Sequence, residues 1–163
     1  MSQESRNINC QIIVPASIER VWQCWTTEEG LQSFMAPEVR IQMEPGGAFE
    51  IYFNPDAPEG KRGSEGMHIL ALQEPTFISF TWNAPPHLED VRQQMTHVDV
   101  NLVGLAMDST RVHLLHGGWG EDGQWEAAHS YFARAWPRVV LPRLRYRFEF
   151  GPVDWSRPPD LDS

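Results

Sequence analysis

Cysteine is scarce in this chain of 163 residues, which contains only Cys10 and Cys24. The two lie in different predicted elements, and nothing in the sequence indicates the close approach of Cβ atoms that a disulfide requires. Thiolate metal sites need several cysteines at short spacing, and this pattern is missing. We therefore expect two free thiols.

Positively charged residues are also few. Lys and Arg number 13 against 22 Asp and Glu, which gives a net charge of −9. Nucleic-acid backbones and anionic membrane surfaces both attract clustered cations. We predict that the protein binds no nucleic acid and no membrane.

Long apolar runs are absent as well. No stretch approaches the roughly 20 apolar residues of a membrane-spanning helix. The opening segment, MSQESRNINCQIIV, lacks a charged region followed by a long apolar one. We expect no membrane span, no signal peptide and a cytoplasmic location.

The sequence also lacks the short signatures of common catalytic sites. It contains no GxSxG, HExxH, GxxxxGK[ST] or CxxC. His113 and His116 are three residues apart in a predicted strand, where that spacing directs side chains to opposite faces. They cannot share a metal ion, so we predict no metal and no other cofactor.

Aromatic and turn-forming residues, in contrast, are abundant. Apolar residues make up 41% of the chain, with seven Trp and eight Phe, enough for the core of one domain. The 13 Pro and 12 Gly indicate many turns. This composition favours a sheet-rich fold over a helical bundle.

Local patterns predict a strand, two short helices and then a series of strands. Ser17 is expected to cap the first helix. Thr26, followed three residues later by Glu29, has the spacing of a capping box and predicts the start of a second helix that ends before Pro37. Residues 84–93 are expected to form a longer loop. The predicted strands are 8–14, 39–43, 49–53, 66–73, 76–83, 94–103 and 110–116.

The last third of the chain predicts a long helix. Its apolar stripe runs over residues 125–140, and Pro137 and Pro142 should kink or split it. Residues 145–150 (RYRFEF) alternate polar and apolar side chains, which is typical of a strand. Residues 151–163 are predicted to form an irregular tail.

These elements predict one α+β domain over residues 1–150. A curved antiparallel sheet of about six or seven strands would wrap around the long C-terminal helix, with two short helices after the first strand. A pocket is expected between sheet and helix. Residues 145–155 are expected to be ordered and to lie against the body of the domain or against a second copy of it, because their aromatic side chains would otherwise be exposed.

Short sequence motifs along the chain resemble those of the START-like, helix-grip superfamily. Within this superfamily they are most similar to the activator of heat-shock-protein-90 ATPase homologue-like family. The similarity covers about residues 8–145. Ala135-Trp136 departs from the family's usual Gly-Trp, and two prolines interrupt the final helix. The words that carry the resemblance are Val21-Trp22-Gln23-Cys24-Trp25-Thr26, Glu29-Gly30-Leu31, Phe34, Pro45-Gly46-Gly47, Gly66, Pro75, Phe80-Thr81-Trp82, Thr110, Val112, Leu114, His116 and Ala135-Trp136.

The resemblance implies a helix-grip fold but several functions. The family includes a eukaryotic co-chaperone domain, whereas other START-like branches bind lipids, hormones or polyketides, or catalyse cyclisation or dehydration. Fold alone does not choose among these.

Our leading hypothesis is a protein that binds a small hydrophobic molecule between sheet and helix. The glycines around Trp119 would form either a mobile lid over the pocket or a simple turn. The residues predicted to line this pocket are His68, Leu70, Phe80, Trp82, Val100, Val112, Leu114, His116, Phe132 and Trp136.

Two alternatives remain open. The first is a co-chaperone-like interaction module that binds a protein partner through Arg138, Arg143 and Arg145, and a homodimer is left open as well. The second is a cavity enzyme, such as a cyclase, dehydratase or hydrolase, in which His68 or His116 acts as general base.

Overall fold

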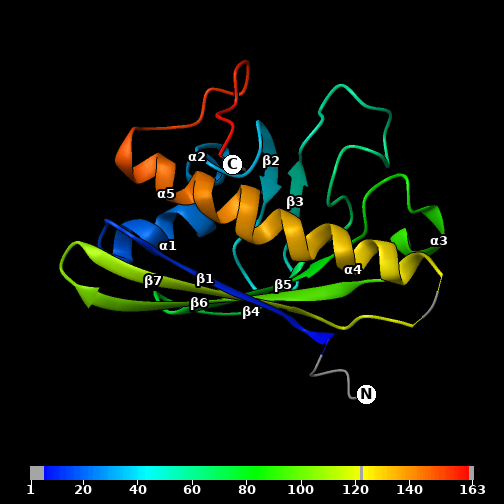
Figure 1. Ribbon diagram of the computed structural model, residues 1–163, viewed down its shortest axis with the longest axis horizontal. Coiled ribbons are helices and arrows are strands. Elements are labelled where there is room, and N and C mark those ends of the chain that lie inside the picture. Colours follow the sequence, from blue (N-terminus) through cyan, green and yellow to red (C-terminus); the bar gives the residue numbers. More distant parts are fainter. Residues whose placement is uncertain (1–5, 122, 162–163) are drawn as a thin grey trace.

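The computed structural model describes residues 6–121 and 123–161. Five antiparallel strands form the main sheet, in the spatial order β1-β7-β6-β5-β4. The long C-terminal helix, residues 124–149, crosses one face of this sheet and is called the helical arm below (Figure 1). The strands are β1 (Ile8–Val14), β4 (Ile69–Gln73), β5 (Phe77–Trp82), β6 (Thr96–Ala106) and β7 (Ser109–Gly117).

A separate hairpin extends the edge of this sheet. Strands β2 (Glu38–Ile41) and β3 (Phe49–Tyr52) pair with each other as a two-stranded sheet, and Tyr52 also forms an isolated bridge with Gly63. An isolated bridge between Ala48 and His68 joins the hairpin to β4, and the Gly46 N–H donates to the Ile69 carbonyl oxygen at 2.7 Å. The α+β helix-grip fold is confirmed, with its seven strands divided between a five-stranded sheet and this hairpin.

Two short helices follow β1, as predicted: α1 (Ile18–Thr26) and α2 (Glu28–Gln32). The Ser17 hydroxyl accepts from the Arg20 N–H and caps α1. The residue that caps α2 is Thr27, whose Oγ1 accepts from the Gly30 N–H at 2.9 Å, so the assignment to Thr26 is wrong by one position. Thr26 is still inside α1, where its hydroxyl donates to the Trp22 carbonyl oxygen at 2.8 Å.

The final helix stays continuous at Pro137 and Pro142, because a short π-helical segment accommodates them. It comprises α4 (Gln124–Ala135), a π-helical segment η2 (Trp136–Val140) and α5 (Leu141–Glu149). Because Pro142 has no N–H, the ordinary bond to the residue four positions earlier is missing there. Just before it, the Leu141 N–H donates to the carbonyl oxygen of Trp136, five residues back, which is the bond of a π-helix.

The predicted strand at 145–150 is wrong, because α5 continues to Glu149. Leu141 and Leu144 are buried, and Phe148 packs against the same core, so these residues form a helical stripe with spacings of three and four. The alternation seen from Arg145 onward hides this stripe, which begins earlier. Phe150, just past the helix, is 76% exposed.

After α5 the chain turns back over α2. Val153 is buried, and its N–H donates to the Ser33 carbonyl oxygen at 2.9 Å. The Trp155 indole N–H donates to the Gln32 carbonyl oxygen at 2.6 Å. The prediction that residues 145–155 lie against the body of the domain is therefore confirmed for Phe148, Val153 and Trp155, whereas Phe150 remains exposed.

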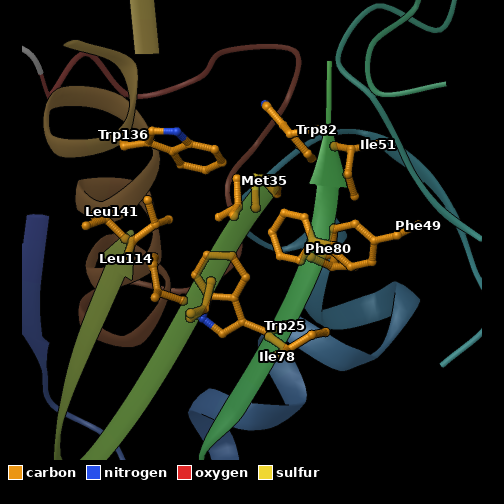
Figure 2. Packing of buried hydrophobic residues seen from close by; sticks show 14 of the residues in the cluster. Trp25, Met35, Phe49, Ile51, Ile78, Phe80, Trp82, Leu114, Trp136 and Leu141 are labelled. Atoms are coloured by element: carbon orange, nitrogen blue, oxygen red, sulfur yellow. The ribbon is translucent and has the colours of Figure 1, made fainter. Parts of the chain in front are cut away.

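The hydrophobic core lies between the sheet and the helical arm (Figure 2). The ring of Phe49 in the hairpin stacks on that of Phe80 in β5, with centroids 4.2 Å apart. The rings of Trp82 and Trp136 are 5.5 Å apart and join β5 to the helix. Burying large rings from all three parts fixes the hairpin and the helix on one sheet face.

Both cysteines are free, as expected. Cys10 in β1 is half-buried, and burial raises its pKa to about 11. Cys24 in α1 is buried, which likewise raises its pKa. No helix among the described residues has the length and apolar character needed to span a membrane.

Candidate functional site

A pocket of about 370 Å³ lies where β3 and β5 end, between the helical arm and two loops. The loop after β5, expected to be irregular, contains the short helix α3 (Glu89–Arg92). The helical arm contributes Tyr131, Phe132, Ala135, Trp136, Val139, Val140 and Arg143. The remaining lining residues are Met35, Phe53, Asn54, Lys61, Arg62, Gly63, Trp82, Asn83, Ala84, Pro85, Pro86 and Arg92.

Aromatic rings form much of the pocket wall. Phe132 and Trp136 stack with an interplanar angle of 27°, and the Trp136 ring packs against that of Trp82. These three side chains are largely covered by the core and present only part of their surface to the pocket. Phe53 and Tyr131 are exposed at its rim. Such a surface suits an apolar ligand.

Three of the ten predicted site residues line this pocket: Trp82, Phe132 and Trp136. Five others lie together in the core beneath it, and each is 0% exposed. A side chain that bordered a water-sized cavity would retain accessible surface, so no such space adjoins these five. The deeper cavity expected beside them is therefore absent, since packed side chains occupy it. They are Phe80, Val100, Val112, Leu114 and His116.

The remaining two, His68 and Leu70, do not line the pocket. Leu70 is 44% exposed, whereas Ile69 between them is fully buried opposite Phe80. The side chain of β4 that enters the core at this point is therefore that of Ile69 and not that of Leu70. An irregularity between Ile69 and Ala71 shifts the register, so strict alternation does not hold along this strand.

His116 is held by hydrogen bonds at both ring nitrogens. The Trp136 indole N–H donates to Nδ1 at 3.0 Å, and an indole nitrogen can only donate. The hydrogen of the neutral ring is therefore on Nε2, which lies 2.7 Å from the Thr96 hydroxyl. That hydroxyl in turn donates to the Trp82 carbonyl oxygen at 3.1 Å. This chain of bonds links β5, β6, β7 and the helix.

Its environment keeps His116 uncharged. Burial lowers the pKa of His116 well below 6.5, and the nearby His97 and His129 lower it further. The ring has no free nitrogen and no contact with the pocket. The geometry gives it a structural role rather than that of the predicted general base.

His113 and His116 point to opposite faces of β7, as predicted. Nε2 of His113 lies 2.5 Å from the Asn9 side-chain oxygen on the outer face. Within residues 6–121 and 123–161, no group of three or more His, Cys, Asp or Glu side chains is arranged to hold a metal ion.

The loop around Trp119 is held against the core by the Trp119 side chain, which favours a turn over a mobile lid. Trp119 is buried, and its indole N–H donates to the His116 carbonyl oxygen at 3.0 Å. A Cβ atom at Gly120 would lie 2.2 Å from the Trp125 indole nitrogen, so glycine allows the backbone to pass close to that ring.

Arg92 in α3 holds the loop wall of the pocket. It is 8% exposed and donates to the carbonyl oxygens of Gly60, Gly63 and Ala84. Its guanidinium is 3.6 Å from the Glu65 carboxylate. That carboxylate also accepts from the backbone N–H groups of Gly60 and Gly63. One arginine therefore ties residues 60–65 to the loop after β5.

Sequence reasoning missed most of the pocket, although part of it had a signal. Phe132, Ala135, Trp136, Val139 and Arg143 recur at spacings of three and four along one helix face. The loop residues had no such signal, because Asn54, Lys61 and Arg62 belong to a segment without periodicity.

Comparison with known proteins assigns the family. Residues 15–149 match the family described as "Activator of Hsp90 ATPase homolog 1-like protein". The chain belongs to this family. The resemblance inferred from short sequence words is thus confirmed. Among curated proteins, none matches the sequence significantly.

Solved structures similar to this member of the Hsp90 ATPase activator-like family share its fold. The Aha1 dimer from Colwellia psychrerythraea is 22% identical, with a TM-score of 0.63 over 89% of this chain and 97% of that one. An HSP90 activator from Plasmodium falciparum is 13% identical, with a TM-score of 0.64 over 90% and 96%. CalU16 from Micromonospora echinospora is 19% identical, with a TM-score of 0.64 over 91% and 76%. At these identities the likeness concerns the fold alone.

Proposed function

We propose that this protein binds a small hydrophobic molecule in the pocket between its helical arm and the loops beyond β3 and β5. The observation that carries the proposal is a space of about 370 Å³ walled by Trp82, Phe132 and Trp136. Sites for small molecules have similar volumes, mostly apolar walls and a few polar groups. Asn54 and Asn83 supply uncharged polar groups here.

The proposal concerns binding rather than turnover. Among the described residues that line the pocket, there is no histidine and no carboxylate to act as a general base. His68 precedes the edge strand β4 and does not line the pocket, and both nitrogens of His116 are occupied.

Tryptophan fluorescence tests this proposal, because Trp82 and Trp136 line the pocket. We expect neutral hydrophobes such as 1-naphthaleneethanol and decanol to change the emission with saturation. Ala135→Phe should fill the pocket and weaken binding about tenfold or more. Ala133→Phe is the matched control, since Ala133 is exposed on the same helix and does not line the pocket. Equal binding by both variants, or none by the parent, contradicts the proposal.

Protein interaction is a second candidate, favoured by the family match and by structural similarity to an HSP90 activator. Arg138 and Arg145 are exposed on the helical arm, and Arg145 pairs only with the nearby Glu149, at 3.1 Å, among the ion pairs of the described chain. If this function holds, the protein should stimulate the ATPase of an Hsp90-class chaperone. Replacing Arg138 and Arg145 with Glu should abolish the stimulation, whereas Arg40→Glu on β2 should not.

A second copy of the chain is the other protein partner suggested by the comparisons, since one similar structure is an Aha1 dimer. Sedimentation equilibrium of the full chain measures this directly. A mass equal to one chain over the tested concentrations would argue against self-association.

A further inference from the structure

The pocket has a charge opposite to that of the whole chain. Its lining includes Lys61, Arg62, Arg92 and Arg143 and no carboxylate, although the chain carries a net charge of −9. Cations gathered at a partly apolar concavity raise the local concentration of anions. A pocket for purely neutral molecules has no need of such a set.

Arg92 does not contribute to this excess, because its donors are committed to backbone carbonyl oxygens and to Glu65. The other three cations differ. Within the described parts of the chain, none of Lys61, Arg62 and Arg143 has a carboxylate at ion-pair distance. Arg62 uses its Nε on the Ala57 carbonyl oxygen at 2.9 Å, which leaves its terminal nitrogens for another acceptor.

Arg143 is the most informative of these residues. Its Nε is buried and has no hydrogen-bond partner among residues 6–121 and 123–161. The guanidinium carbon lies 5.3 Å from the centroid of the Trp155 ring, which supports the group from one side. Burial lowers the pKa of Arg143. Partial burial of a cation is costly, and because Arg143 lines the pocket, an anion bound to its guanidinium there would offset that cost.

We propose that the ligand is an amphipathic organic anion, in which an apolar or aromatic body lies on Trp82, Phe132 and Trp136 and a carboxylate is bound by Arg143, Arg62 and Lys61. The inference rests on the proposed function and adds the charge of the ligand to it. Arginine is well suited to this role, because its planar fork binds a carboxylate through two parallel hydrogen bonds.

The test compares two probes that differ in one group, 1-naphthaleneacetate and 1-naphthaleneethanol, by isothermal titration calorimetry on the full chain. The acid should bind about tenfold tighter or more, because hydrogen bonds to charged groups are the stronger ones. In Arg143→Met and Arg62→Met this preference should fall to about twofold or less. Arg143→Lys should keep part of it. Arg145→Met, an exposed position on α5 outside the pocket, should keep all of it.

The outcomes separate this inference from the proposed function. If both probes bind the parent equally well, the anionic ligand class is wrong and hydrophobic binding stands. If the two arginine variants retain the full preference for the acid, the carboxylate is not bound by Arg143 and Arg62, and the proposed site for it is overturned. If neither probe binds, both proposals are overturned. The melting temperature of each variant shows that a lost preference is not a lost fold.

Discussion

At the scale of single residues, His116 couples folding to pH. Its two ring nitrogens are bonded to Trp136 and Thr96, and its pKa is well below 6.5 in the folded chain. In the unfolded chain the same ring takes up a proton near pH 6.5. Above that pH both states are neutral there, and the residue adds no pH dependence. Below it only the unfolded state gains the proton, so stability is lost as the pH falls.

We expect this loss to be about 1.4 kcal/mol per pH unit from His116, beginning near pH 6.5. Urea unfolding between pH 7.5 and 5 measures it. His116→Gln is the control, because its amide offers one acceptor and one donor group but no titration in this range. The free energy of unfolding should therefore fall less steeply in the variant. Two parallel curves would show that His116 is not the buried neutral ring described above.

Arg92 is a second single residue with a large expected effect, because it holds together the two loops that wall the pocket. Arg92→Met leaves the carbonyl oxygens of Gly60 and Gly63 without their shared donor and the Glu65 carboxylate without its ion-pair partner. We expect a loss of about 3 kcal/mol in unfolding free energy, since breaking a buried charged network is costly. Amide hydrogen exchange should increase in residues 54–65. Arg40 is the exposed partner of an ion pair with Glu50, so Arg40→Met should change stability by less than about 1 kcal/mol and leave that exchange unchanged.

At the scale of elements, the contact between α1 and α2 depends on Gly30. A Cβ atom there would lie 2.2 Å from the Gln23 carbonyl oxygen and 2.5 Å from the Cys24 Cα, both backbone atoms. Gly30→Ala must therefore push the two helices apart, and we expect a loss of about 3 kcal/mol. Thermal unfolding measures it. Glu28→Ala, an exposed change in the same helix, should cost less than about 1 kcal/mol. Equal melting temperatures would contradict the close approach.

The segment after α5 is the second element with a measurable effect. A chain that ends after Gly151 loses buried Val153 and the Trp155 hydrogen bond to Gln32. We expect about 2 kcal/mol of stability to be lost from this burial and hydrogen bonding. A chain that ends after Arg157 keeps both contacts and serves as the control. If the two truncated chains melt together, the segment contributes nothing to stability.

Most elements were predictable because their patterns are local. Ser17, for example, begins α1 as its side chain suggests. The incorrect predictions concern positions whose secondary structure depends on neighbouring elements or on burial in the core. Thr26 and Thr27 are equally suitable caps by type, and only the continuation of α1 through Thr26 selects Thr27. Residues 145–149 alternate like a strand, but the burial of Leu141 and Leu144 keeps them helical.

At the scale of the whole molecule, the sequence was more informative about the fold than about the site. The words that carry the family resemblance are packing residues. Gly30 permits a close helix contact, Thr110 donates to the Ala16 carbonyl oxygen, and Trp136 binds His116. The pocket instead combines one helix face with loops from distant parts of the chain. The loops that contain Arg62 and Asn83 are joined by the hydrogen bonds of Arg92 and by that of the Asn83 side chain to the Gly63 carbonyl oxygen, which no periodic pattern encodes.

The two cysteines have a practical consequence for labelling this molecule. Only thiolates react with maleimides, and with a pKa of about 11 only about one in ten thousand Cys10 side chains is a thiolate at pH 7. Cys24 is buried, with a raised pKa, so it too should react slowly. A cysteine placed at the exposed pocket rim, as in Tyr131→Cys, should therefore accept a fluorophore selectively while both native cysteines are retained. Such a conjugate would report events at the pocket in a chain whose core is unaltered.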